Sequence, residues 1–188
     1  MVTQRFFFRG DVVFGILQLI VNTVAGVLGG VLLLRFWMQA IRVRPPMSVG
    51  QFTYTLSDWL VKPIRRIIPG VGGFDWASLI GAFLVVLIAN SIMYFGGASA
   101  ELIVVGAVFR LLNWIIYGFI ALLIIEAVFS WINPHAPLAP FVHALNDPLL
   151  RPIRRVIPPI GGIDLSVLVA LILLQILQHI LARAAAFI

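Results

Sequence analysis

The sequence lacks cysteine and has few charged residues. Of its 188 residues, 62% are hydrophobic and 11% are Asp, Glu, Lys or Arg, and the mean hydropathy is +1.10. The absence of cysteine excludes disulfide bonds, thiol chemistry and cysteine-ligated metals. A soluble domain has about 25% charged and about 45–50% apolar residues. This composition therefore predicts an integral membrane protein.

The motifs of common enzymes are also missing. The sequence has no phosphate-binding glycine loop, no nucleophile with a paired base and no cluster of metal ligands. We therefore expect no enzyme activity, no resident metal and no cofactor. The net charge of +6 would suggest nucleic acid as the partner of a soluble protein. Here the cations lie in loops between apolar runs, so we expect anionic lipid headgroups and no nucleic acid.

Four apolar runs are long enough to cross a membrane as helices, which takes about 20 residues. A helix satisfies its backbone hydrogen bonds internally and is therefore stable in lipid. The alternating segments of about 10 residues that mark a membrane β-barrel are missing. We predict an all-α membrane protein with four transmembrane helices. The runs extend over about Val12–Met38, Trp76–Tyr94, Leu102–Trp131 and Leu165–Ile180 or beyond.

A basic, proline-bounded segment occurs twice, at residues 62–75 and 151–164. The offset is 89 residues (164 − 75), and 9 of the 14 positions are identical. The same offset aligns Asp58 with Asp147 outside the segment. The pattern predicts two parallel-duplicated helical hairpins, since two spans per unit preserve orientation. The predicted units are residues 11–99 and 100–188, after an N-terminal extension of residues 1–10.

Each copy mixes cations with prolines, so it cannot itself span the membrane. We expect amphipathic helical pieces in the headgroup plane, one over about Val49–Trp59. In the second copy, Asp147 as N-cap and Pro148 at the first helical position predict a piece that continues to Ile157. The cations either hold the loop on one side of the membrane or form a docking surface for anionic lipid or an acidic partner. This basic motif comprises Lys62, Arg65, Arg66, Arg151, Arg154 and Arg155.

Glycine and aspartate close each copy of the segment. Gly72-Gly73 and Gly161-Gly162 predict tight turns. Asp75 and Asp164 directly precede apolar runs, so we expect them to be N-caps of the following spans. The alternative is that each aspartate pairs with an arginine of its own motif.

The distribution of cations predicts the orientation. Eight cations lie in the two long loops, against three on the other side of the predicted spans, and the positive-inside rule therefore places the motif loops in the cytoplasm and both termini outside. The loop cations are Arg42, Arg44 and the six motif residues, and the others are Arg5, Arg9 and Arg183.

The repeated segment has a specific pattern. It reads Pro63-Ile-Arg65-Arg66-Ile-Ile-Pro69, then Gly72-Gly73 and Asp75, with second copies at 152–158, 161–162 and 164. This pattern resembles the signature of the YggT family, also called YlmG in some bacteria and plastids, whose small integral membrane proteins carry one or two such units. The second copy ends in the usual aspartate-x-serine, Asp164-Leu-Ser166, whereas the first reads Asp75-Trp-Ala77-Ser78.

The resemblance implies a multi-pass protein of the bacterial inner membrane without enzyme activity. Bacterial members are linked to cell division, envelope organisation and osmotic stress or ion homeostasis, and plastid relatives to haem attachment in cytochrome b assembly and to nucleoid organisation. We expect a scaffold or assembly factor with membrane or cytosolic protein partners. The alternatives are an ion or small-solute pathway and a haem or cytochrome assembly factor. Gly26-x-x-x-Gly30 permits close helix packing, within the chain or in a homo-oligomer.

Two of the charges inside the apolar runs, Arg35 and Glu126, lie at similar depth. The offset of 89 residues places Glu126 level with Trp37, two residues from Arg35. Because an unpaired charge in lipid is costly, we predict an ion pair between Arg35 and Glu126 that joins the repeats. A role in an ion pathway is the alternative.

Four polar residues, Asn22, Asn90, Arg110 and His179, lie toward the opposite face. Asn90 and His179 occupy equivalent positions, about 22 Å along their helices from the motif side. We predict a polar cluster of these four residues that links the repeats by hydrogen bonds. The alternative is a binding site for an anion, a lipid or a haem propionate, although His179 could supply only one axial bond to haem.

Overall fold

The computed structural model describes residues 3–93, 97–157 and 164–187, and every regular element in these ranges is an α-helix. Four of the helices, α1, α3, α4 and α6, are long and apolar enough to cross a membrane. The predicted all-α class with four spans is therefore confirmed. The helices are α1 (Thr3–Ala40), α2 (Met47–Ile67), α3 (Trp76–Met93), α4 (Ala100–Ile132), α5 (Ala139–Val156) and α6 (Ser166–Ala185).

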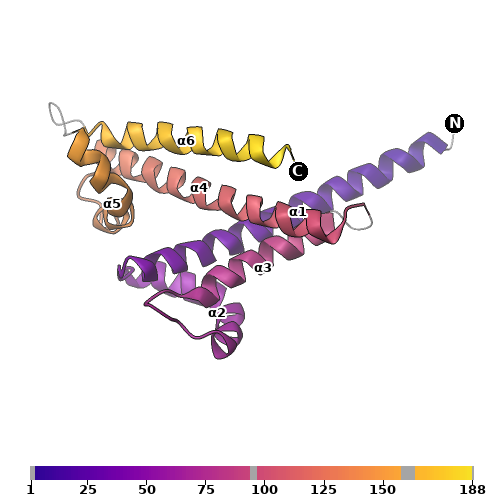
Figure 1. Ribbon diagram of the computed structural model, residues 1–188, viewed down its shortest axis with the longest axis horizontal. Coiled ribbons are helices and arrows are strands. Elements are labelled where there is room, and N and C mark those ends of the chain that lie inside the picture. Colours follow the sequence, from indigo (N-terminus) through magenta and orange to yellow (C-terminus); the bar gives the residue numbers. More distant parts are fainter. Residues whose placement is uncertain (1–2, 94–96, 158–163, 188) are drawn as a thin grey trace.

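The six helices form two hairpins with the same orientation (Figure 1). The chain runs toward one end of the bundle in α1 and α4 and returns in α3 and α6. Helices α2 and α5 lie at that end, whereas the start of α1 and the end of α6 point the opposite way (Figure 1). We call α1–α3 repeat 1 and α4–α6 repeat 2.

Each repeat has its own small apolar core, and α4 joins the two. In repeat 1 the core is built around Leu32 and Val61, and in repeat 2 around Leu123 and Leu150. Helix α4 packs against α1 and α3 as well as against α5 and α6. Most of the remaining apolar surface of the spans is exposed, as expected for helices that face lipid.

The contact between the repeats has one close approach of helices. A Cβ atom on Gly29 of α1 would lie 2.0 Å from Cζ3 of Trp114 on α4, so this position admits only glycine without a shift of the indole. A Cβ on Gly26 or Gly30 would meet no atom within 4 Å. The Gly26-x-x-x-Gly30 pattern therefore does not mediate close packing against any part of the chain that the structure describes.

The amphipathic helices α2 and α5 bury the same face. The buried polar and apolar side chains recur at the offset of 89 residues, with a spacing of four that places them on one stripe of each helix. These residues are Thr53, Ser57 and Val61 in α2, and Val142, Asn146 and Leu150 in α5.

Both amphipathic helices are longer than the sequence predicts. Helix α2 continues through Pro63 instead of ending near Trp59, and α5 runs through Pro148 and Pro152, so the prediction that Asp147 caps the start of a helix is wrong. A proline inside a helix leaves the carbonyl four residues earlier without its partner. The three prolines lie on exposed faces, where water or headgroups can hydrogen-bond these carbonyls.

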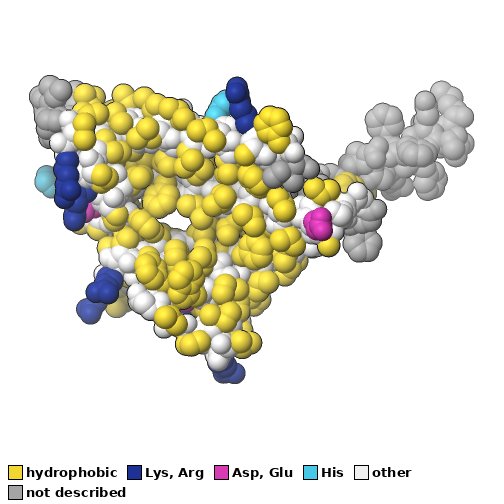
Figure 2. Space-filling view, in the orientation of Figure 1, with side chains coloured by type: hydrophobic (Ala, Val, Ile, Leu, Met, Phe, Trp, Pro, Cys, Tyr) yellow, Lys and Arg dark blue, Asp and Glu magenta, His cyan; other side chains and the backbone are white. Residues whose placement is uncertain are grey.

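The distribution of side chains over the surface agrees with this arrangement. Figure 2 shows hydrophobic side chains over most of the face in view, while Lys and Arg lie mainly at the left and lower margins, where Figure 1 places α5 and α2. The predicted turn at Gly72-Gly73 is confirmed, since both residues have positive φ, +71° and +86°. The equivalent Gly161-Gly162 lies outside the described residues.

Candidate functional site

A buried ion-pair network closes repeat 1 at the α2 end of the bundle. Arg35, whose side chain is 6% exposed, donates from Nη1 to Asp58 Oδ1 at 2.7 Å and to Ser57 Oγ at 2.6 Å. Its Nε lies 3.4 Å from Oδ2 of Asp75, which is 1% exposed and accepts a 2.5 Å hydrogen bond from Arg65 Nη2. The network thus ties α1, α2 and the start of α3 together.

Repeat 2 has a corresponding network. Arg154 donates to Asp164 Oδ2 from Nε at 2.9 Å and from Nη2 at 2.7 Å. Its Nη2 also lies 3.4 Å from Glu126 Oε1, which contacts His143 Nδ1 at 2.9 Å. These contacts connect α4, α5 and the residue two before α6.

The two networks share a common frame at the offset of 89 residues. Each has an i,i+4 ion pair on its amphipathic helix, at 2.8 Å for Lys62–Asp58 and 2.5 Å for Arg151–Asp147. In each network an arginine of the motif also binds the aspartate that ends the motif, Asp75 or Asp164. Sequence reasoning missed the contributions of Asp58 and Asp147, although their alignment and their spacing of four from a motif cation were visible in the sequence.

The predicted ion pair between Arg35 and Glu126 is wrong. Arg35 binds Asp58 and Asp75 within repeat 1, and Glu126 contacts Arg154 within repeat 2. The physical reason is that each motif supplies an opposite charge within its own hairpin. The repeats are joined here by Trp37 instead, whose Nε1 donates to the Leu145 carbonyl at 2.9 Å.

The two arginines of each motif have different environments. Arg65 and Arg154, the first of each pair, bind the aspartates, which is the alternative that the sequence left open. The side chains of Arg66 and Arg155, the second of each pair, are exposed and make no hydrogen bond or ion pair with any described residue. The doubled arginine therefore combines one structural cation with one free cation.

A serine supports each aspartate. Ser78 Oγ donates to Asp75 Oδ2 at 2.7 Å, and in repeat 2 both the Ser166 hydroxyl and its backbone N–H, the latter at 2.9 Å, donate to Asp164 Oδ1. Asp164 thus accepts a backbone N–H at the start of α6, whereas Asp75 contacts the first turn of α3 through a side chain. Serine binds the aspartate in both repeats, although it stands one position later in the first.

The polar cluster within the spans contains three of its four predicted residues. Arg110 of α4 donates to Asn90 Oδ1 at 2.9 Å and to Asn22 Oδ1 at 2.5 Å, and its guanidinium lies 5.4 Å from the centre of the Trp114 ring. These hydrogen bonds link the repeats as predicted. His179 is exposed on α6, near Arg183, and does not join them.

Comparison with known proteins identifies the family of the two repeats. Residues 14–95 and 105–185 both match the CCB3/YggT family model. The chain belongs to the CCB3/YggT family. YggT of Escherichia coli strain K12 is 32% identical over 163 residues, 86% of this chain and 87% of that relative. A Haemophilus influenzae protein is 35% identical over 79% of this chain and 82% of its own length. No solved structure matches the chain.

In this YggT-family protein, each matched segment covers most of one hairpin and contains one ion-pair network. The family pattern of proline, two arginines, two glycines and aspartate is therefore the corner of a hairpin. In repeat 1 it joins the amphipathic helix to the following span through the Arg65–Asp75 pair, and in repeat 2 through Arg154–Asp164.

Hydrogen-bond partners lower the pKa of two carboxyl groups in these networks. The hydrogen bonds from Lys62 and Arg35 hold the pKa of Asp58 below its ordinary value of 3.8. Burial raises the pKa of Asp164, but the hydrogen bonds from Ser166 and Arg154 outweigh it, so this pKa also lies below 3.8. Both groups are therefore carboxylates at neutral pH.

We expect the stability of the protein to fall in acid because of these two groups. An aspartate whose pKa is lowered in the folded state stabilises the fold at pH values above its unfolded pKa, which is near 3.8. This stabilisation is lost as the pH falls through the lower pKa of the folded state. The melting temperature in detergent should be insensitive to Asp58 and Asp164 between pH 7 and about 5 and decrease below about 4. Asp164→Asn should flatten this decrease, and Glu101→Gln, at an exposed position, should not. An equal effect of the two variants would contradict the assignment.

Proposed function

We propose that the protein is a non-catalytic membrane scaffold or assembly factor that engages lipid headgroups and a protein partner through the free cations of its two motifs. The observation that carries this proposal is the pair Arg66 and Arg155. They are exposed, occupy equivalent positions in the two repeats and stand next to the last residues of α2 and α5, two helices that lie at the same end of the bundle (Figure 1). An arginine without a carboxylate partner is available to bind phosphate or an acidic side chain.

The apolar surroundings of these cations support an interfacial location. Trp59 and Trp131 are 63% and 84% exposed, and Ile67 and Val156, next to the free arginines, are 82% and 81% exposed. Tryptophan is enriched where the hydrocarbon core meets the headgroups, and apolar side chains on amphipathic helices insert at the same depth. A surface of this kind suits headgroups and the juxtamembrane part of another membrane protein.

The proposal includes a location and an orientation. The protein is placed in the bacterial inner membrane with the α2 and α5 end in the cytoplasm and both termini outside, because this end carries most of the cations. The family resemblance favours envelope organisation, cell division or the response to osmotic stress as the process in which the scaffold acts. A homo-oligomer is compatible with this proposal.

A pathway for ions or small solutes has less support. Arg35 and Glu126, the charges that would line it near the motif end, lie in separate networks with their own partners. His179 is exposed, apart from the Arg110 cluster. We therefore expect no solute-specific flux from the purified protein in liposomes, and no Soret band from protein expressed with haem available. Flux abolished by Glu126→Gln would contradict the scaffold proposal.

The scaffold proposal is tested by crosslinking in the native membrane. A photo-crosslinker placed at Trp59 or Val156 should capture a specific protein, identified by mass spectrometry, and the yield should fall at least about tenfold in Arg66→Ala/Arg155→Ala, which corresponds to about 1.4 kcal/mol. Arg183→Ala is the control, since this exposed cation is in the last turn of α6, whose end points away from α2 and α5 (Figure 1). Capture that is unchanged in the double variant would overturn the proposal.

A further inference from the structure

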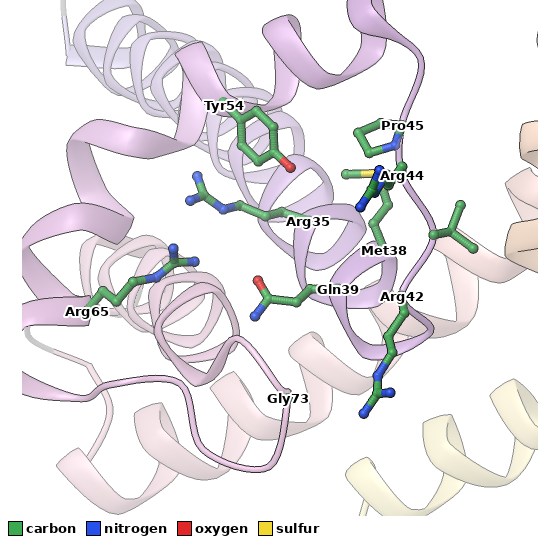
Figure 3. Close-up of a pocket in the computed structure, with 10 residues that line it drawn as sticks. Arg35, Met38, Gln39, Arg42, Arg44, Pro45, Tyr54, Arg65 and Gly73 are labelled. Atoms are coloured by element: carbon green, nitrogen blue, oxygen red, sulfur yellow. The ribbon is translucent and has the colours of Figure 1, made fainter.

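Repeat 1 contains a pocket that the motif alone does not explain. It has a volume of about 450 Å³ and lies between the C-terminal end of α1, α2 and the glycine turn (Figure 3). Four arginines line it, with the Gln39 amide and the Tyr54 hydroxyl as neutral polar groups, and its lining includes no acidic residue. The four arginines are Arg35, Arg42, Arg44 and Arg65.

The charge of this pocket is not balanced by the described part of the chain. Arg35 and Arg65 bind the aspartates Asp58 and Asp75. The side chains of Arg42 and Arg44 form no ion pair or hydrogen bond with a described residue. Four guanidinium groups against two carboxylates, one of which also pairs with Lys62, leave at least two positive charges without a counterion. Like charges in a small space repel each other unless an anion lies between them.

The pocket is built around a side chain that is fixed in place. Arg35 is 6% exposed, its guanidinium stacks on the Tyr54 ring at 5.0 Å, and its Nε is a buried donor without a hydrogen-bond acceptor, 3.4 Å from Asp75. Arg42 has a φ of 58°, a conformation that costs energy for a residue other than glycine and that clusters at functional sites. Its Nη2 lies 3.7 Å from where a Cβ on Gly73 would be.

The pocket is confined to repeat 1. At the offset of 89 residues, three of its four arginines are replaced by uncharged residues in repeat 2, and only Arg65 has a basic counterpart, Arg154. The positions of Arg35, Arg42 and Arg44 correspond to Ile124, Trp131 and Asn133. The shared motif therefore forms the corner in both repeats, and the additional arginines give repeat 1 a separate property.

We propose that this pocket binds a phosphate monoester or inorganic phosphate. Such a group carries a charge of about −1.5 to −2 near neutral pH, which matches the two unbalanced positive charges. Arginine binds phosphate oxygens in a bidentate manner, and Gln39 and Tyr54 can donate to the remaining oxygens. The position of the pocket beside the end of a span admits two sources of this group, the headgroup of phosphatidic acid and free phosphate. The site goes beyond the proposed scaffold function, which rests on other arginines.

The test uses the full-length protein in detergent micelles with two probes. The first is short-chain phosphatidic acid, with phosphatidylcholine of the same chain length as reference, and bound lipid is counted by native mass spectrometry. The second is inorganic phosphate, whose effect on the melting temperature is compared with chloride at equal ionic strength. The variant is Arg42→Ala/Arg44→Ala, which removes exposed cations without carboxylate partners. The control is Arg9→Ala/Arg183→Ala, which removes the same charge from the side of the predicted spans opposite the motif loops.

We expect at least a tenfold loss of affinity for one or both probes in Arg42→Ala/Arg44→Ala and less than a twofold change in the control. A loss confined to phosphatidic acid assigns the site to a headgroup, and a loss confined to phosphate assigns it to the free anion. Equal losses in the two double variants would show general charge attraction and overturn the site, as would unchanged binding of both probes. If the first variant aggregates, Arg44→Gln alone takes its place. If crosslinks to the protein partner persist in Arg42→Ala/Arg44→Ala, the phosphate site and the scaffold surface are independent of each other.

Discussion

Replacing Arg35 by leucine is expected to lower the free energy of unfolding by about 3 kcal/mol. Removing one partner of a buried ion pair costs about 3–5 kcal/mol, because the other charge remains in a medium of low dielectric. The lower end of this range applies because Asp75 keeps its 2.5 Å contact with Arg65 and its hydrogen bond from Ser78. Asp58 likewise keeps Lys62.

This loss is to be measured by unfolding in mixed micelles or by steric trapping in bicelles. The matched control is Arg66→Leu, which removes an exposed arginine at the same end of the bundle and is expected to change the stability by less than about 0.5 kcal/mol. Adding Glu126→Leu to Arg35→Leu should give additive losses, because the two charges belong to separate networks. If the two losses are not additive, the assignment of one network to each repeat is wrong.

The spans and the duplication could be predicted because they depend on periodic, local properties of the chain. Apolar run length determines where a helix crosses lipid, and the offset of 89 residues aligns the two hairpins throughout. The pairing of Asp75 with Arg65 was also within reach, since both residues belong to one short motif. Contacts within one hairpin corner need no knowledge of how the hairpins pack.

The partners of the charges within the spans could not be predicted from depth alone. Residues two apart on a helix point about 200° apart, so Arg35 and the counterpart of Glu126, Trp37, face different sides of α1. Trp37 turns toward repeat 2, where its ring meets Phe119 edge-on at 4.9 Å. The same limit applies to His179, because the offset placed it level with Asn90 but did not show that its side chain is exposed and outside the Arg110 cluster.

The close approach of α1 and α4 at Gly29 leads to the second large effect. Gly29→Ala is expected to destabilise the protein by about 1–3 kcal/mol, the usual cost of overpacking, even though alanine favours a helix over glycine by about 1 kcal/mol. The added Cβ would lie 2.0 Å from Trp114 Cζ3 and 2.5 Å from Cε3, so the indole must move. That movement also disturbs the stacking of Trp114 on Arg110, which bridges Asn22 and Asn90.

The neighbouring glycine provides the control for this prediction. Gly30→Ala adds the same methyl group where no atom lies within 4 Å, so it should leave the stability unchanged or raise it by up to about 1 kcal/mol through helix propensity. Gly29→Ala combined with Trp114→Leu should recover part of the loss, with a coupling energy of about 0.5–3 kcal/mol in a double-mutant cycle. Equal effects of Gly29→Ala and Gly30→Ala would mean that α1 and α4 do not approach each other at Gly29, and the packing of the two repeats would then have to differ from the one described.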